Sequence, residues 1–210
     1  MTMRRRALLT AAALAGPVLL AGAATAGPKA ACNLVADPAG DATGFVVTGL
    51  PLPNDDALDI VSGDVASNKK LLTGVIRLAS MATDSTSPTG RTYYVNFTIN
   101  GTKAFLDAIV ASDGSVTFNA GDFTGTNSGR KTLGAVEGVV DPAKKEIRIT
   151  APAGTWTESA KPGAKIAGLD LLAQRFIGTT TTGGVTPTAD EAKSDAVYVA
   201  GSASCVTPGK

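Results

Sequence analysis

The sequence predicts an all-β protein: one antiparallel β-sandwich of the immunoglobulin-like or jelly-roll type, with about eight or nine short strands. Many segments alternate apolar and polar residues with a period of two, which is typical of strands with one buried face. Dipeptides that favour tight turns separate these segments, and we find no amphipathic helix of useful length. Short strands with turn signals in one domain favour a sandwich.

The N-terminus predicts a secretory signal at residues 1–26. Arginines at 4–6 form a positive region, residues 7–22 are apolar, and Ala24-Thr25-Ala26 offers small residues for cleavage. The general secretion route is expected, since the twin-arginine match is weak. An uncleaved membrane anchor is the alternative, but the apolar run is short and contains Pro17. Residues 27–210 are therefore expected to form a single secreted domain with no membrane span.

The charge and the absence of histidine exclude several function classes. Without the three signal arginines, 16 basic residues face 18 acidic ones, and no basic cluster suggests nucleic-acid binding. The chain has no histidine, which excludes Ser-His-Asp machinery, histidine-containing zinc sites and histidine-ligated haem. We expect a protein that is not an enzyme, and a carboxylate-based hydrolase is the remaining catalytic alternative.

The two cysteines, Cys32 and Cys205, stand near the two ends of the mature chain. An exported chain with two cysteines is expected to join them, while free thiols or an intermolecular bond are the alternatives. No Cys-X-X-Cys pattern indicates a redox site. The expected bond ties the ends of one domain together and requires the two Cα atoms to lie within about 7 Å.

The strands are expected in pairs along the chain. Residues 58–65 and 71–79 flank a polar connection, and 92–99 alternates strictly before Asn100-Gly101, the strongest hairpin signal. Residues 104–111 and 115–118 continue this segment as a meander. The later expected strands are 134–140, 146–150, 166–177 and 196–200, with loops at 82–90, 121–131 and 178–187 and at most one helical turn at 190–194.

Aspartates concentrate early in the mature chain and suggest a cation site. Ca²⁺ prefers six to eight oxygen ligands, and two loops that meet at one end of a sandwich can supply several of them. Aspartate is also favoured in turns for its local hydrogen bonds, so turn formation is the alternative. The candidate Ca²⁺ ligands are Asp37, Asp41, Asp55, Asp56 and Asp59.

Three aromatic residues are candidates for ligand binding: Trp156, Tyr94 and Tyr198. Trp156 could stack on a sugar ring or pack into the core, and core packing is favoured for a single tryptophan. Asp107 lies in a strand that is apolar on both faces and therefore needs a partner, for which Arg77 and Arg148 are candidates.

The early segments Asp37-Pro-Ala-Gly-Asp41, Leu58-Asp59-Ile60 and Leu72-Thr-Gly-Val-Ile-Arg-Leu78 resemble the opening of secreted domains similar to carbohydrate-binding module family 9 and the related DOMON domains. The resemblance covers the first third of the chain and implies a β-sandwich that binds sugars or, in some branches, haem. The sugar-binding members use a pair of aromatic residues, and only Trp156 can be placed. The haem-binding members use Met and His, and the mature chain has Met81 alone.

These observations predict an exported, non-catalytic binding or envelope-associated domain that recognises a glycan or another cell-surface component. A structural or accessory extracellular protein without a small-molecule ligand is the alternative. The oligomeric state does not follow from the sequence.

Overall fold

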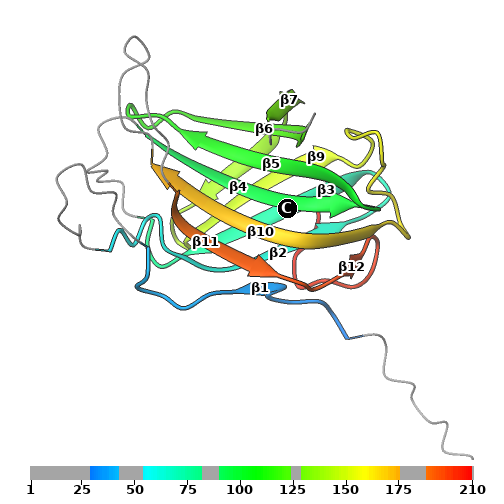
Figure 1. Cartoon of the computed structure of the whole chain (residues 1–210), viewed down its shortest axis with the longest axis horizontal. Coiled ribbons are helices and arrows are strands. Elements are labelled where there is room, and N and C mark those ends of the chain that lie inside the picture. Colours follow the sequence, from blue (N-terminus) through cyan, green and yellow to red (C-terminus); the bar gives the residue numbers. More distant parts are fainter. Residues whose placement is uncertain (1–28, 43–53, 82–89, 124–128, 176–187, 210) are drawn as a thin grey trace, which may run out of the picture.

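The computed structural model describes residues 29–42, 54–81, 90–123, 129–175 and 188–209. The predicted signal and the expected loop at 178–187 lie outside these residues, as does most of the loop at 82–90. The described residues form two antiparallel sheets packed against each other, which confirms the β-sandwich (Figure 1). Figure 1 looks onto the seven-stranded sheet, with β2, β3 and β9 behind β4 and β10.

The five-stranded sheet has the order β1-β2-β3-β9-β8. Its strands are β1 (Val35–Ala36), β2 (Ile60–Ser67), β3 (Leu71–Leu78), β8 (Glu137–Asp141) and β9 (Glu146–Pro152).

The seven-stranded sheet has the order β11-β10-β4-β5-β6-β7, and β12 also pairs with β10. Its strands are β4 (Arg91–Ile99), β5 (Thr102–Val110), β6 (Val116–Phe123), β7 (Arg130–Ala135), β10 (Lys165–Arg175), β11 (Thr188–Ser194) and β12 (Tyr198–Val199).

The meander predicted over residues 92–118 is present as β4, β5 and β6. Asn100 and Gly101 have φ values of 50° and 93°, as a type I′ hairpin turn requires. Gly114, with a φ of 83°, lies in the next turn. The alternation in β4 places Tyr93, Val95, Phe97 and Ile99 in the core and their neighbours on the outer face.

Four expectations about the strands differ from the structure. Residues 134–140 were expected to be one strand, but the chain passes from β7 in one sheet to β8 in the other at Val136. The loop expected at 121–131 contains the end of β6 and the start of β7, and residues 190–194 belong to strand β11. Twelve strands appear in the described parts of the chain, where eight or nine were expected, and two of them have only two residues.

The core fills the space between the sheets. Side chains of β2, β3 and β9 meet those of β4, β5 and β10, and Gly63 on β2 leaves room for Leu171 on β10, because a Cβ there would collide with that side chain. The largest fully buried side chains are Tyr198, Phe97, Phe105, Leu58, Ile60, Leu72, Ile76, Leu78, Ile99, Leu106, Ile147 and Ile149.

The segments around Cys32 and Cys205 lie together beside the five-stranded sheet. Cys32 and Cys205 form a disulfide with their Cα atoms 5.1 Å apart, which confirms the predicted pairing and its distance limit. Backbone hydrogen bonds from Ala31 N to Ala203 O and from Cys205 N to Ala31 O flank the bond. The disulfide indicates an oxidising environment outside the cytoplasm.

Candidate functional site: a polar and aromatic sheet face with an acidic cluster at the sandwich edge

The outer face of the seven-stranded sheet carries polar and aromatic side chains where β10, β4, β5 and β6 lie side by side. Asp107 on β5 stands opposite Tyr94 on β4 and Asn119 on β6, and Asp170 on β10 stands opposite Asn96 on β4. These five residues alternate with core-facing neighbours, so they project together from the sheet. We call Tyr94, Asn96, Asp107, Asn119 and Asp170 the Tyr94 face.

Two amide–carboxylate pairs organise the Tyr94 face. Asn119 Nδ2 donates to Asp107 Oδ1 at 2.8 Å, and Asn96 Nδ2 donates to Asp170 Oδ2 at 3.4 Å. Burial raises the pKa of the Asp107 carboxyl, while the bond from Asn119 and the charge of Arg130 oppose the rise. Burial, followed by the charge of Glu191, raises the pKa of Asp170. Both acids therefore hold a proton more readily than exposed aspartates do.

Arg130 reaches over this face from the edge strand β7. Its guanidinium carbon lies 3.9 Å from the centroid of the Tyr94 ring, 5.3 Å from that of Phe123 and 6.0 Å from that of Phe105. Two strands separate β7 from β4, which is roughly 14 Å between backbones in a flat sheet. The side chains of Arg130 and Tyr94 therefore extend toward each other across Phe105. The guanidinium covers part of the aromatic surface.

The structure places the three predicted ligand-binding aromatics very differently. Tyr94 lies on the outer sheet face, but Trp156 is 4% exposed and Tyr198 is 2% exposed. Trp156 donates from Nε1 to Gly121 O at 2.7 Å and packs edge-on against Phe97. Tyr198 donates to Ser202 O at 3.0 Å from the core. These placements remove Trp156 and Tyr198 from the predicted ligand surface and agree with the alternative of core packing for Trp156.

The expected partners of Asp107 were wrong. Arg77 binds Asp64 at 2.7 Å and Glu146 at 3.2 Å, and Arg148 binds Glu146 at 2.7 Å, all on the five-stranded sheet. Sequence alone could not separate the two sheets, because both supply arginines at outward positions of regular strands.

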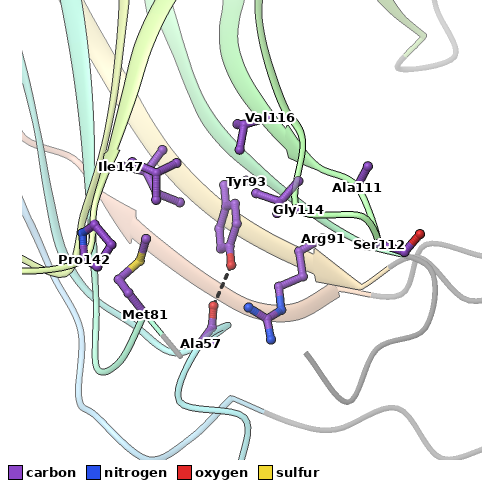
Figure 2. A pocket seen from close by; sticks show the side chains of 13 residues that line it. Ala57, Met81, Arg91, Tyr93, Ala111, Ser112, Gly114, Val116, Pro142 and Ile147 are labelled. Atoms are coloured by element: carbon purple, nitrogen blue, oxygen red, sulfur yellow. Dashed lines mark hydrogen bonds between the residues drawn. The ribbon is translucent and has the colours of Figure 1, made fainter. Parts of the chain in front are cut away.

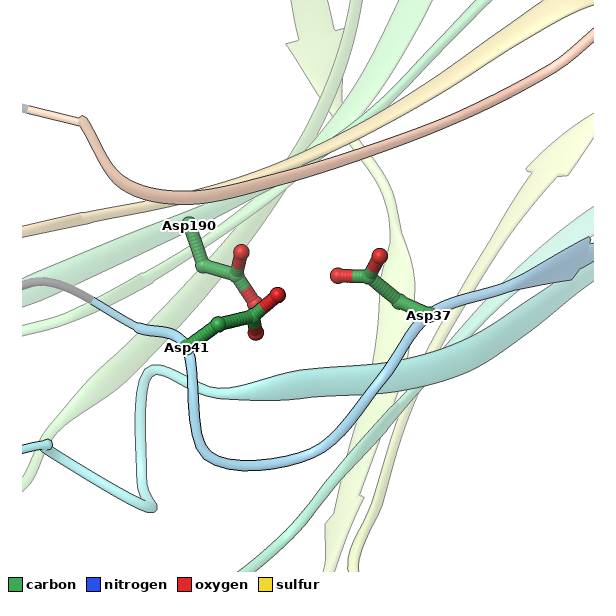
Figure 3. A group of neighbouring side chains, drawn as sticks. All are labelled: Asp37, Asp41 and Asp190. Carbon is green, nitrogen blue, oxygen red and sulfur yellow. The ribbon is translucent and has the colours of Figure 1, made fainter.

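The predicted calcium ligands divide into two groups. Asp37 and Asp41 meet Asp190 of β11, with one carboxylate oxygen of each within 4.8 Å of the others (Figure 3). Asp59 lies beside them, because its Oδ2 accepts the amide of Gly40 at 2.5 Å. We call Asp37, Asp41, Asp59 and Asp190 the acidic cluster.

Asp55 and Asp56 have other partners. Asp55 forms an ion pair with Arg175 and accepts the amide of Ala57, and Asp56 accepts Nδ2 of Asn54 at 2.7 Å. Neither is among the three mutually close carboxylates. Asp190 was missed because its segment was expected to be a helical turn.

The acidic cluster is electrostatically strained. Burial, followed by the charges of Asp190, Asp41 and Asp59, raises the pKa of Asp37 to about 6. Burial also raises the pKa of Asp190, against hydrogen bonds from the amides of Ile60 and Glu191. No ion pair within the described ranges involves any of the four carboxylates.

A cavity of about 490 Å³ opens at one end of the sandwich, a size within the range of small-molecule pockets (Figure 2). Tyr93 donates from its hydroxyl to Ala57 O at 2.6 Å within it. No carboxylate occurs among the described residues that line it: Ala57, Met81, Gly90, Arg91, Tyr93, Val110, Ala111, Ser112, Gly114, Val116, Val140, Pro142 and Ile147.

Comparisons with protein-family models, with curated proteins and with solved structures find no match for this chain. Among the described residues, no helix is long and apolar enough to cross a membrane.

Proposed function

We propose that this chain is an exported, non-catalytic binding domain, and that the Tyr94 face recognises a glycan of the cell surface. One observation carries the proposal: an aromatic ring on the outer side of a sheet is flanked by the pairs Asp107–Asn119 and Asp170–Asn96. Sugars combine apolar ring faces with hydroxyls that both donate and accept hydrogen bonds. Aromatic rings together with carboxylates and amides complement both features.

The exported state rests on two features. The disulfide needs an oxidising compartment, and residues 1–26 have the pattern of a secretory signal. The chain has no histidine, the side chain whose unperturbed pKa lies closest to neutral pH. Recognition at the cell surface is therefore favoured over acid–base catalysis.

A structural or accessory role is the second candidate, and the position of the Arg130 guanidinium over the Tyr94 ring favours it. Arg130 lies 3.9 Å from the centroid of the Tyr94 ring, so a sugar that stacks on that side has to displace the guanidinium. The hydrolase alternative is weaker, because the described lining of the 490 Å³ cavity offers no pair of carboxylates.

Retention on polysaccharides tests the proposal. The oxidised mature protein is incubated with cell-wall preparations and neutral and acidic polysaccharides, and the bound fraction is measured. Tyr94→Ala is expected to reduce retention by about tenfold, equivalent to ~1.4 kcal/mol, on the polymer that binds the largest fraction of the wild type. The reason is that the substitution removes the apolar surface between the two polar pairs.

The matched control is Val139→Ala, which shortens an exposed side chain on the five-stranded sheet and should leave retention unchanged. Retention of the wild type on no polymer favours the structural role. Equal losses in both variants would place the binding surface elsewhere.

A further inference from the structure

We propose that Asp37, Asp41 and Asp190 form a Ca²⁺ site that joins the segment after β1 to strand β11, beside the buried side-chain oxygens of Asp59 and Asn54. This inference is independent of the proposed glycan recognition. It rests on the positions of the carboxylates and on buried acceptor atoms that have no donor.

The three carboxylates meet the distance condition for one shared ion. Oxygens that bind Ca²⁺ lie about 2.3–2.6 Å from it, so two ligands of one ion are at most ~5.2 Å apart. One oxygen from each of Asp37, Asp41 and Asp190 lies within 4.8 Å of the others. Figure 3 shows the three side chains converging from opposite sides of a common space.

Buried acceptors beside the three carboxylates provide a second, separate observation. Asp59 is fully buried; its Oδ2 accepts from Gly40 N at 2.5 Å and from Asn54 Nδ2 at 3.0 Å, while its Oδ1 has no donor. Asn54 Oδ1 and Asp37 Oδ2 are also buried without a donor. Leaving such groups unpaired destabilises the fold, and more so for charged groups. All three are oxygen acceptors, the kind of atom that a hard cation binds.

The backbone fixes these side chains before any ion arrives. Asp190 accepts the amides of Ile60 at 2.6 Å and Glu191 at 2.8 Å, so its carboxylate connects β11 to the start of β2. The 37–41 turn is held by the bond from Gly40 N to Asp59, and Gly40 has a φ of 96°, which glycine adopts without strain. An ion here would tie an edge of the five-stranded sheet to an edge of the seven-stranded sheet.

The ligand chemistry favours Ca²⁺ over Mg²⁺. Carboxylates gathered from three chain segments give an irregular shell of oxygens, which Ca²⁺ accepts, whereas Mg²⁺ requires near-ideal octahedral geometry and retains its waters. Extracellular Ca²⁺ modules bind with a Kd of about 10⁻⁴–10⁻³ M, so the relevant titration extends to roughly 10 mM.

Calorimetric titration and thermal unfolding of the oxidised mature protein test the site. After treatment with a chelator and its removal, CaCl₂ is expected to bind saturably with one ion per chain and to raise Tm, while MgCl₂ binds at least about tenfold more weakly. Asp41→Asn changes an exposed side chain, so the variant should fold, and it is expected to weaken Ca²⁺ binding by about tenfold or more because it removes one charge from the shell.

Asp190→Asn provides a second ligand variant, and Asp195→Asn removes the same charge from an exposed position as the control. Asp195→Asn should bind Ca²⁺ like the wild type. Absence of saturable binding at 10 mM CaCl₂, or an equal effect of Asp41→Asn and Asp195→Asn, would overturn the site. Equal affinity for Mg²⁺ would overturn the assignment to Ca²⁺.

Discussion

Replacement of Arg77 by methionine is expected to lower the free energy of unfolding of the domain by about 3 kcal/mol. The guanidinium binds Asp64 at 2.7 Å and Glu146 at 3.2 Å, and it connects β2, β3 and β9 across the outer face of their sheet. Asp64 is 1% exposed and would keep only the amide of Leu34 as a donor. Breaking a buried ion pair from one side costs about 3–5 kcal/mol, and the partial exposure of Arg77 places the expected loss at the lower end.

Urea unfolding of the oxidised protein measures this loss. Lys144→Met removes an exposed cation from its pair with Asp141 and should cost less than about 1 kcal/mol. The second substitution Asp64→Asn should restore part of the stability of Arg77→Met, because it removes the stranded charge. An Arg77→Met variant as stable as Lys144→Met would show that the buried network does not stabilise the fold.

Removal of the disulfide is expected to destabilise the domain by about 3–5 kcal/mol. Cys32 and Cys205 are separated by 173 residues, and the chain-entropy model gives ~5 kcal/mol as the ceiling for a loop of this length. The actual loss should be smaller, since hydrogen bonds between residues 31 and 203–205 persist without the bond. The variant is the double substitution Cys32→Ala and Cys205→Ala.

The same double variant separates the covalent bond from the side chains. Wild-type protein treated with a reductant should unfold at the same urea concentration as the variant, and the reductant should not affect the variant. Equal stability of oxidised wild type and variant would mean that the packed ends, and not the disulfide, hold the domain closed.

The sequence predicts the centre of this fold better than its edges. Residues 92–118 were identified because alternation and turn chemistry agree: Asn100-Gly101 takes the positive φ values that its turn needs. Strand β11 was missed because its residues, Thr188–Ser194, are mostly polar, as an edge strand with one solvated face permits. The crossing between sheets at Val136 was missed because a period of two is the same in either sheet.

Only part of the candidate sites could be predicted from the sequence. Asp37 and Asp41 were identified because acidic turns are visible in sequence. Asp190 could not be, since only the packing of β11 against β1 brings it to them. Tyr94 alternates with core residues and was recognised as a candidate. Trp156 and Tyr198 have similar chemistry, but tertiary packing decides their burial.

Chemical-shift mapping tests the central claim most directly. Isotope-labelled mature protein is titrated with a soluble oligosaccharide from the polymer that retains it, and backbone amide shifts are followed. Saturable shifts concentrated at Tyr94, Asp107, Asn119 and the neighbouring positions of β4, β5, β6 and β10 are the predicted result. Saturable shifts confined to the cavity around Tyr93, or no shifts at all, would contradict recognition of a glycan by the Tyr94 face.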